Sequence, residues 1–222
     1  MGATEILKCR GCGAEALSGG ACAECGRLQP FPPGADHWTV LGLERRLTLD
    51  RAELERRFHE LCRRFHPDYF RLRPLDEQAQ SLESSAAVNT AYRTLREPVG
   101  RAEYLLECCG MALGASGQSR PPADLFEEIM ELQEARQDLL MADPDEAPPL
   151  RARLAAARTG LEGRYARTEA DLVGLFPRFD EASDGERQAL LTRIRDALAM
   201  RAYLRTVLRD LNATLGVAEK VE

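Results

Sequence analysis

The feature that most constrains this chain is a proline between two segments with the apolar spacing of amphipathic helices. The first segment covers about residues 51–65 and places its apolar side chains on one face: Leu54, Phe58, Leu61, Cys62 and Phe65. Pro67 disfavours helical geometry at the residue before it, so this helix must end near His66. A second helix is expected over about 76–96. The pattern predicts an antiparallel helical hairpin in which the two apolar faces meet.

Neighbouring residues complete the expected hairpin. Asp50 and Glu53 have the spacing of a capping box at the start of the first helix. Residues 37–43 are expected to form a short helical turn that closes the open side of the hairpin. The second helix is expected to bury one face, with Tyr92 beside it: Ala79, Leu82, Ala86, Asn89 and Leu95.

The composition argues against several classes of protein. The 222 residues are 44% hydrophobic and 30% charged, which is typical of a globular protein. No apolar run approaches the roughly 20 residues that a membrane span needs. The net charge of −6 argues against a dedicated nucleic-acid binder. No phosphate-binding loop, Ser-His-Asp order or zincin motif is present, so the chain is not expected to be an enzyme.

The composition also divides the chain into three regions. Residues 1–35 are rich in Cys and Gly and end in a Pro-rich linker, residues 36–112 carry the expected hairpin, and residues 113–222 are helical after a second linker over 114–122. Three helices are expected in the last region: about 122–141, 148–176 and 184–215. The expected fold class is all-α, a helical hairpin and a three-helix bundle preceded by a small zinc-knuckle module.

Four of the seven cysteines form two Cys-x-x-Cys-Gly units: Cys9, Cys12, Cys22 and Cys25. Each unit can bind a metal ion through two thiolates, and the glycine after it permits a tight turn. Together they complete a tetrahedral thiolate site that suits Zn²⁺, with iron as an alternative. Because sulfur fills all four positions, the expected role is structural, folding a module too small for a core. A disulfide pair, free thiols or a redox role are the other possibilities.

The remaining cysteines are expected to be packing residues. Cys62 lies on the apolar face of the first helix, and Cys108 and Cys109 are expected to be buried or half-buried. Without an export signal, a disulfide framework is not expected.

His66, Pro67 and Asp68 lie where the expected hairpin turns. Pro67 fixes the backbone, and the Asp68 carboxylate can accept charge-assisted bonds from a partner arginine. The preceding helix carries arginines away from its apolar face: Arg56, Arg57, Arg63 and Arg64. Residues 51–73 contain seven Arg and four acidic residues, a basic surface that would steer association with an acidic partner. The alternative is that the motif only ends a helix and caps a turn.

From residues 38–43 through 58–68 to 89–95, the sequence resembles the J-domain family. In that family the His-Pro-Asp loop and the basic helix before it dock on a heat-shock chaperone, accelerate its ATP hydrolysis and trap its client. The resemblance therefore assigns chaperone binding to His66, Pro67, Asp68 and the four arginines, and it implies no active site in this chain.

Other stretches are similar to the HscB type of J-protein, which serves iron–sulfur cluster assembly. Residues 98–106 look like the segment that joins the J-domain to the C-terminal bundle, and residues 9–26 match the four-cysteine module of eukaryotic members. The resemblance implies a co-chaperone that stimulates an HscA/DnaK-type ATPase and delivers the IscU-type scaffold for cluster transfer. The alternatives are a J-protein for other clients and a zinc-dependent redox or regulatory module.

The helix expected over 122–141 has two apolar stripes. The longer one can face the bundle: Leu125, Ile129, Leu132 and Leu139. The shorter one, Phe126 and Met130, is available to a partner unless both residues are core. The resemblance assigns scaffold binding to five residues: Phe126, Met130, Glu131, Glu134 and Tyr203. Glu127 and Gln133 depart from the family, in which Met and a basic residue are common at those positions.

The expected partners are thus an ATPase chaperone and a scaffold protein, with no nucleic acid and no membrane. The expected location is the bacterial cytoplasm, because neither a secretory signal nor a transit peptide is visible. A processed mitochondrial form is the alternative.

Overall fold

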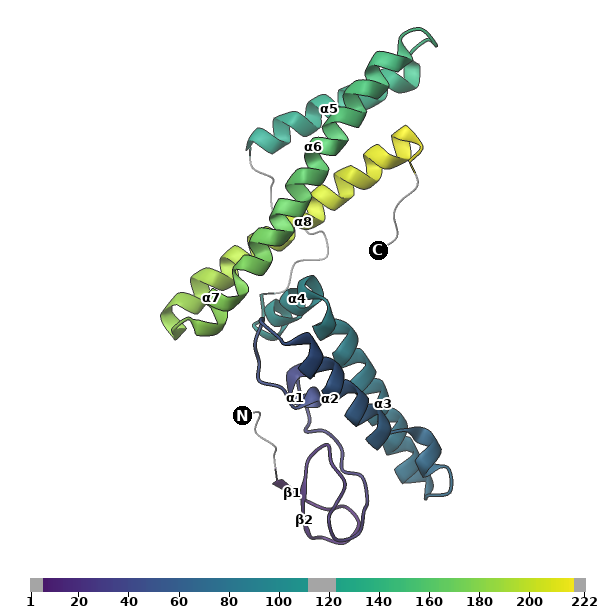
Figure 1. The fold of residues 1–222 in the computed structure, drawn as a ribbon, viewed down its shortest axis with the longest axis vertical. Helices are drawn as coiled ribbons and strands as arrows, with labels where there is room; N and C mark the ends of the chain where they lie inside the picture. The colour runs from purple at the N-terminus through teal and green to yellow at the C-terminus, as the bar shows by residue number, and fades with distance from the viewer. Residues whose placement is uncertain (1–5, 112–122, 218–222) are drawn as a thin grey trace. The chain divides into compact units, whose positions relative to one another are not determined.

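The structure is a computed structural model that describes residues 6–111 and 123–217, with side chains from residue 127 onward in the second range. Its internal contacts separate two compact units, Met1–Cys108 and Cys109–Glu222, and each is described by itself. Helices dominate both units, so the expected all-α class is confirmed (Figure 1). The linker expected over 114–122 lies outside the described residues.

The first unit begins with a small β-hairpin that the sequence pattern did not predict. Strands β1 (Ile6–Lys8) and β2 (Glu15–Leu17) pair antiparallel, with Leu7 opposite Ala16. Each strand has three residues, which is too short to show alternation in the sequence.

The expected helical hairpin is present. Helix α2 (Arg51–Arg64) and helix α3 (Leu75–Arg96) pack together, and a short 3₁₀ helix, η1 (Pro67–Phe70), lies in the loop between them. Helix α1 (His37–Leu41) packs against both helices. The Asp50 side chain caps α2 as expected, because it accepts a hydrogen bond from a backbone N–H of the first turn at 2.9 Å.

Helix α3 buries a different face from the expected one. Its buried residues are Glu77, Ser81, Ser84, Val88, Ala91 and Leu95. Only Leu95 belongs to both sets, whereas Leu82 and Ala86 are exposed. The Ser81 hydroxyl donates a hydrogen bond of 2.8 Å to the Phe65 carbonyl at the end of α2. Apolar spacing missed this face because polar side chains are buried there, and their bonding depends on the facing helix.

Helix α4 (Pro98–Cys108) completes the first unit. The buried Arg101 guanidinium donates a hydrogen bond of 2.8 Å to the Leu95 carbonyl, which ties α4 to the end of α3. Trp38 of α1 is almost fully buried and stacks on Tyr104 with 5.4 Å between ring centroids. These contacts bring α1, α3 and α4 into one core.

The end of α4 corrects an expectation about two cysteines. The helix ends at Cys108, and Gly110 adopts the left-handed conformation with φ of 69°. Cys108 and Cys109 are both exposed, because they follow the last buried turn of the helix. The expectation that they are buried or half-buried is therefore wrong. Cys62, by contrast, is half-buried on α2, and burial raises the pKa of its thiol.

The second unit contains the three expected long helices. These are α5 (Ala123–Met141), α6 (Ala147–Gly174) and α8 (Asp184–Leu215), and α6 packs against both of the others. A further helix, α7 (Phe176–Glu181), was not predicted; Pro177 lies in its first turn, where proline is favoured. The bundle core consists of Ile129, Leu132, Ala135, Leu154, Leu161, Leu204 and Leu211.

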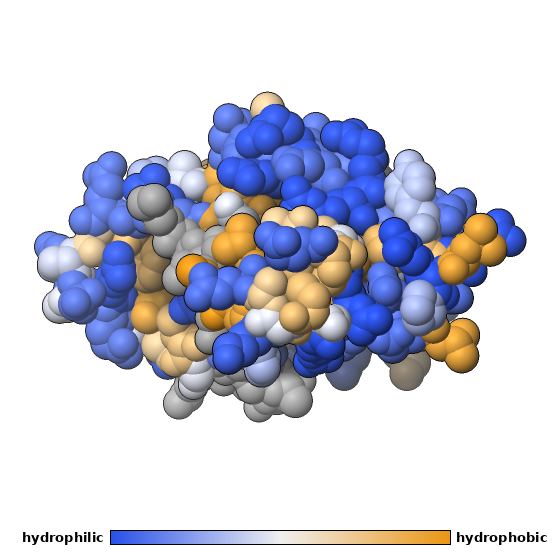
Figure 2. Space-filling view, turned by 90° about the horizontal axis from the view of Figure 1, so that it is seen from below, coloured by the Kyte–Doolittle hydropathy of each residue, from blue (hydrophilic) through white to orange (hydrophobic). Residues whose placement is uncertain are grey.

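The surface is largely hydrophilic on the face shown in Figure 2, with apolar patches between charged side chains. Within the described ranges, no helix is both long enough and apolar enough to cross a membrane.

Two equivalent substitutions test the corrected face of α3. Replacing buried Leu95 with alanine should destabilise the first unit by about 2–5 kcal/mol, because it leaves a cavity. The same change at exposed Leu82 should cost about 0.5 kcal/mol or less. Urea unfolding followed by the fluorescence of Trp38, the single tryptophan, measures this unit in the full chain. Equal effects of the two changes would contradict the assignment.

Candidate functional site

The four predicted cysteines come together in the N-terminal module. The sulfur atoms of Cys9, Cys12, Cys22 and Cys25 all lie within 4.8 Å of one another. The Sγ atoms of Cys9 and Cys25 are 3.5 Å apart, and those of Cys12 and Cys22 are 3.7 Å apart. A tetrahedral ion with metal–sulfur bonds of about 2.3 Å needs sulfur atoms about 3.8 Å apart. The cluster therefore fits a four-coordinate metal ion that these thiols would hold.

The two cysteine turns have the same backbone design. The Gly13 N–H donates to the Cys9 carbonyl at 3.0 Å, and the Gly26 N–H donates to the Cys22 carbonyl at 2.8 Å. Both glycines have positive φ, 76° and 71°, which a side chain would disfavour. This repeat explains why each Cys-x-x-Cys pair is followed by glycine.

Gln29 is a supporting residue that the sequence pattern did not reveal. Its side chain is fully buried and donates hydrogen bonds to the Cys9 sulfur at 3.3 Å and to the Arg27 carbonyl at 2.8 Å. The Gly11 N–H also donates to the Cys9 sulfur at 3.3 Å. Such bonds stabilise negative charge on sulfur and orient the ligand. A lone glutamine four residues after a cysteine carries no signal in the sequence.

The thiols of the cluster differ in acidity. The backbone N–H groups of Cys12 and Gly11 lower the pKa of Cys9 to about 6. At Cys12 the backbone N–H of Ala14 lowers the pKa, but the Cys25 thiol and burial outweigh it, and the pKa rises to about 12. A bound cation would stabilise all four thiolates.

The His66-Pro67-Asp68 corner is exposed, as the sequence analysis expected. The side chains of His66 and Asp68 are 55% and 71% exposed. His66 caps the N-terminus of η1, and its Nδ1 accepts a hydrogen bond from the Asp68 N–H at 3.3 Å. The corner stands on a buried base, because Phe65 has no exposed surface. A partner can therefore reach the imidazole and the carboxylate.

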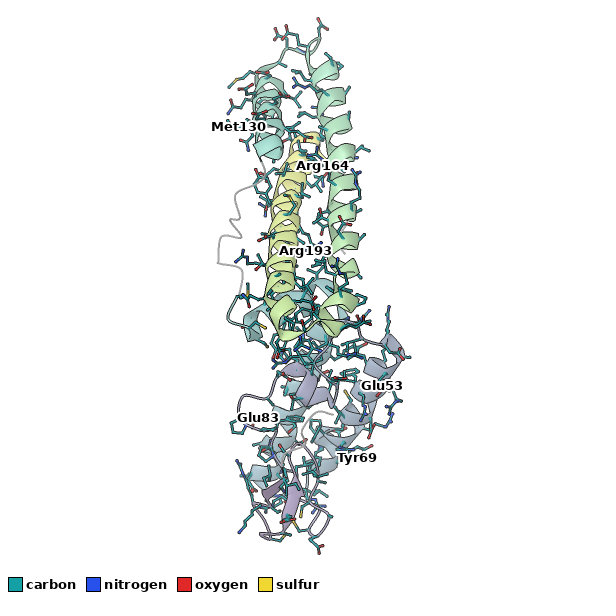
Figure 3. The ribbon with its side chains drawn as sticks, turned by 90° about the vertical axis from the view of Figure 1, so that its left-hand side faces the viewer. Glu53, Tyr69, Glu83, Met130, Arg164 and Arg193 are labelled. Atoms are coloured by element: carbon teal, nitrogen blue, oxygen red, sulfur yellow. The ribbon has the colours of Figure 1, made fainter. Side chains whose placement is uncertain are left out.

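The basic face of α2 is partly neutralised within the helix itself. The Glu53 carboxylate pairs with Arg56 at 2.6 Å and with Arg57 at 2.9 Å, instead of completing the expected capping box. Arg64 pairs with Glu60 at 3.2 Å, and Arg63 is exposed. Exposed ion pairs of this kind are weak, so the guanidinium groups can exchange them for a partner carboxylate. Figure 3 shows Glu53 on this surface.

Exposed apolar side chains next to the corner were not predicted. Tyr69 packs its ring edge-on to His66 with 5.8 Å between centroids and is largely exposed (Figure 3). Leu72 and Leu75 follow it and are also exposed. Three exposed apolar side chains beside two polar ones have the composition of a protein contact surface.

The second predicted surface lies on the bundle. Met130 is 49% exposed and projects from α5, so it is not a core residue (Figure 3). Glu131 and Glu134 are exposed, and Glu131 pairs with Arg153 at 3.5 Å. Tyr203 is half-buried against the bundle core, and burial raises the pKa of its hydroxyl. The side chains of Leu125 and Phe126 lie outside the described residues, so the second stripe is seen only at Met130.

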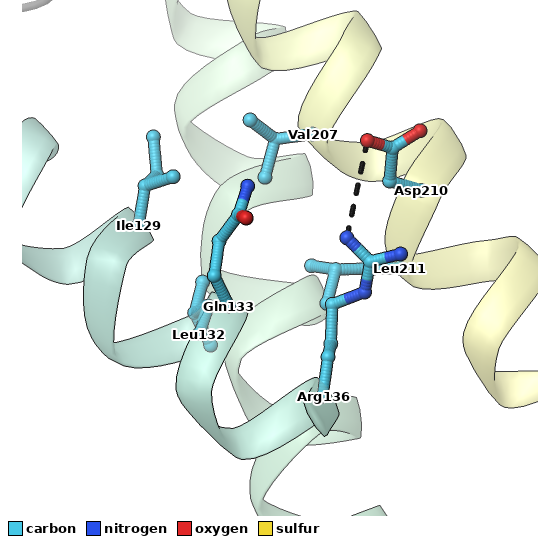
Figure 4. A pocket seen from close by; sticks show the side chains of 7 residues that line it. All are labelled: Ile129, Leu132, Gln133, Arg136, Val207, Asp210 and Leu211. Carbon is cyan, nitrogen blue, oxygen red and sulfur yellow. Dashed lines mark ion pairs between the residues drawn. The ribbon is translucent and has the colours of Figure 1, made fainter. Parts of the chain in front are cut away.

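A small crevice of about 20 Å³ separates α5 from α8 beside the core (Figure 4). Gln133 and Arg136 line one side, and Val207 and Asp210 line the other. Arg136 donates a hydrogen bond to Thr214 at 2.8 Å and pairs with Asp210 at 3.9 Å. The space holds about one water molecule, so this crevice is not a ligand pocket.

The helical hairpin exposes His-Pro-Asp at its turn, as the resemblance to the J-domain class implies. Comparison with known proteins agrees. The chain is 33% identical over 128 residues to the iron–sulfur cluster co-chaperone protein HscB of Mus musculus, covering 58% of this chain and 53% of that protein. It is 33% identical over 104 residues to co-chaperone protein HscB of Proteus mirabilis, covering 47% and 60% of the two chains. It is 34% identical over 113 residues to the HscB homolog of Vibrio parahaemolyticus, covering 50% and 66%.

Solved structures show the same fold. Human co-chaperone protein HscB has a TM-score of 0.68 at 23% identity, covering 93% of this chain and 98% of that one. Chaperone HscB from Vibrio cholerae has a TM-score of 0.53 at 23% identity, covering 81% and 96%. No protein-family model matches the chain. The matched segments span between 53% and 66% of the curated relatives. The chain is a homologue of the HscB co-chaperones and carries a four-cysteine cluster.

The role of Gln29 can be tested by metal affinity. Replacing Gln29 with leucine removes the hydrogen bond to the Cys9 sulfur, so zinc affinity should fall about tenfold. Competition with a chromogenic chelator measures this in the full chain. The same change at Gln137, which is exposed on α5, should leave the affinity unchanged. An unaltered affinity in Gln29→Leu would show that the bond to sulfur does not support the ion.

Proposed function

We propose that this protein is a co-chaperone that stimulates the ATPase of an HscA/DnaK-type chaperone and delivers an IscU-type scaffold for iron–sulfur cluster transfer. The observation that supports the first part is the exposure of His66 and Asp68 at the turn of a helical hairpin whose neighbouring residue, Phe65, is buried. The name of the mouse relative, an iron–sulfur cluster co-chaperone, supports the second part.

The corner offers a partner two different polar groups. Asp68 can accept a charge-assisted bond from an arginine, and His66 can donate or accept through its imidazole. Pro67 limits backbone freedom between them, so less conformational entropy is lost when a partner binds. The exposed arginines of α2 would meet an acidic surface and increase the association rate.

The bundle is proposed to hold the scaffold protein through α5. The exposed thioether of Met130 supplies an apolar contact. Glu131 directly follows it, and Glu134 lies one turn further along the helix. Phe126 of the same stripe and Tyr203 of α8 complete the proposed contact set. An apolar centre with acidic neighbours suits a scaffold surface that has an apolar patch and basic residues around it.

We propose zinc as the ion of the four-cysteine cluster, with a structural role. The four sulfur ligands support this proposal, since they leave no open coordination position for substrate. A bound zinc ion would supply the folding free energy that this small module cannot gain from a core. Iron is the alternative, and its thiolate charge-transfer absorption would distinguish it from colourless zinc.

Two other functions make different predictions. A J-protein for other clients would stimulate the ATPase without binding a purified IscU-type scaffold. A redox or regulatory module would lose its activity directly when Cys9 and Cys12 are replaced, whereas a structural ion predicts a loss of folding of residues 6–31 first.

The proposed role of the corner is tested by partner ATPase rates. His66→Gln keeps a polar side chain but removes the imidazole, so stimulation should be abolished. His59→Gln, on the exposed side of α2, should stimulate like the unaltered protein. Steady-state phosphate release with the chaperone at fixed concentration measures both. Full stimulation by His66→Gln would refute the proposal.

The proposed scaffold surface is tested by binding. Met130→Ala removes an exposed apolar contact, so the dissociation constant for the scaffold should rise about 5- to 30-fold. Leu140→Ala removes a more exposed apolar side chain at the other end of α5 and should change binding less than about twofold. Isothermal titration calorimetry gives both constants. A larger effect at Leu140 would place the contact elsewhere on the helix.

A further inference from the structure

The metal module touches the hairpin on both sides of the His-Pro-Asp corner. On one side, Arg27 pairs with Asp76 at 3.3 Å and with Glu77 at 3.5 Å, and both acidic residues lie in the first turn of α3. On the other side, the ring of Phe31 meets that of Phe65, directly after α2, with centroids 5.6 Å apart. We call these the bridging contacts, because together they span the two ends of the loop that carries the corner.

The cysteine turns fix the position of Arg27. Arg27 follows the second turn, and its carbonyl accepts hydrogen bonds from the Cys22 N–H at 2.9 Å and from Gln29 at 2.8 Å. Its side chain then runs over Gly11 in the first turn, where an added Cβ would lie 3.0 Å from the arginine Cδ and Nε atoms. The guanidinium is therefore held by both halves of the cluster.

Phe31 is fixed by the module in a similar way. Its ring packs on Gly19, where an added Cβ would approach the ring to 2.5 Å. The preceding Pro30 carbonyl accepts hydrogen bonds from the Gly19 N–H at 2.9 Å and from the Ser18 hydroxyl at 3.0 Å. The Pro-rich segment is thus anchored to the module and does not act as a free linker at this point.

The residues that Arg27 and Phe31 contact lie beside the ends of the loop. The Glu77 side chain is only 9% exposed, and its pair with Arg27 compensates a carboxylate that burial would otherwise disfavour. The next residue, Gln78, donates hydrogen bonds to the Arg73 carbonyl at 2.8 Å and to the Arg71 carbonyl at 3.3 Å. Phe65 immediately precedes His66. The Phe31 contact is therefore one residue before the loop. The Arg27 contact is one or two residues before Gln78, which holds the loop through its hydrogen bonds.

We infer that Arg27 and Phe31 are positioning residues that transmit the folded state of the four-cysteine module to the His66–Asp68 loop. Metal binding orders the two cysteine turns, the turns hold Arg27 and Phe31, and these hold the two ends of the loop. The four-cysteine module would then be part of the chaperone-docking apparatus rather than a separate appendage. The consequence for ATPase stimulation rests on the proposed function, whereas the coupling itself does not.

Hydrogen–deuterium exchange of the full zinc-loaded chain tests this coupling without any partner. Arg27→Gln should make amides in residues 66–78 exchange about two- to fivefold faster, with the zinc content and the exchange of α6 unchanged. Arg10→Gln, an equal charge change on an exposed residue of the same module, should leave residues 66–78 unaffected. Unchanged exchange there in Arg27→Gln would overturn the inference.

Two further exchange measurements test the same coupling independently of Arg27. Phe31→Leu alters the second contact at a residue outside both cysteine turns and should loosen the same residues, so a loss of zinc in Arg27→Gln would not obscure the result. Removal of zinc by a chelator should increase exchange in residues 66–78 as well as in the module. Loosening confined to residues 6–31 would overturn the coupling. If His66→Gln instead keeps full ATPase stimulation, the proposed function fails while the exchange result stands.

Discussion

The junction of α2 and α3 is the contact on which the first unit depends. Pro67 prevents α2 from continuing, and the Phe65 carbonyl at its end would be left without a helical partner. The Ser81 hydroxyl of α3 satisfies that carbonyl, and the Phe65 ring is buried beside it. Because the end of α2 is fixed from both helices, His66 and Asp68 can be exposed without being loosely held.

The N-terminal module and the bundle are stabilised by different kinds of interaction. The module buries few apolar side chains, among them Cys9, Ala16, Cys22 and Leu28, so a metal ion held by the four thiols would supply stability that this small core lacks. The bundle buries a continuous set of aliphatic side chains from three long helices. Its core is complete without Met130, which leaves that side chain free to meet another protein.

Ion pairs reduce the net charge of the surface near the corner. The arginines of α2 are largely paired with glutamates of the same helix, which keeps the surface soluble while leaving the pairs weak enough to exchange. Arg27 differs because its partner Glu77 is buried. Loss of Arg27 would leave the buried Glu77 carboxylate without this partner, so the contact has a structural consequence that the exposed pairs lack.

The helical hairpin, the exposed corner and the four clustered cysteines could be predicted from the sequence alone. Pro67, the apolar spacing of α2 and the repeated Cys-x-x-Cys-Gly act over a few residues, and local chemistry suffices to interpret them. Three features became visible only in the folded chain: the buried face of α3, the hydrogen bond of Gln29 to sulfur, and the contacts of Arg27 and Phe31. Each of these joins residues that are distant in the chain, and a polar side chain reveals its partner only when the fold brings the two together.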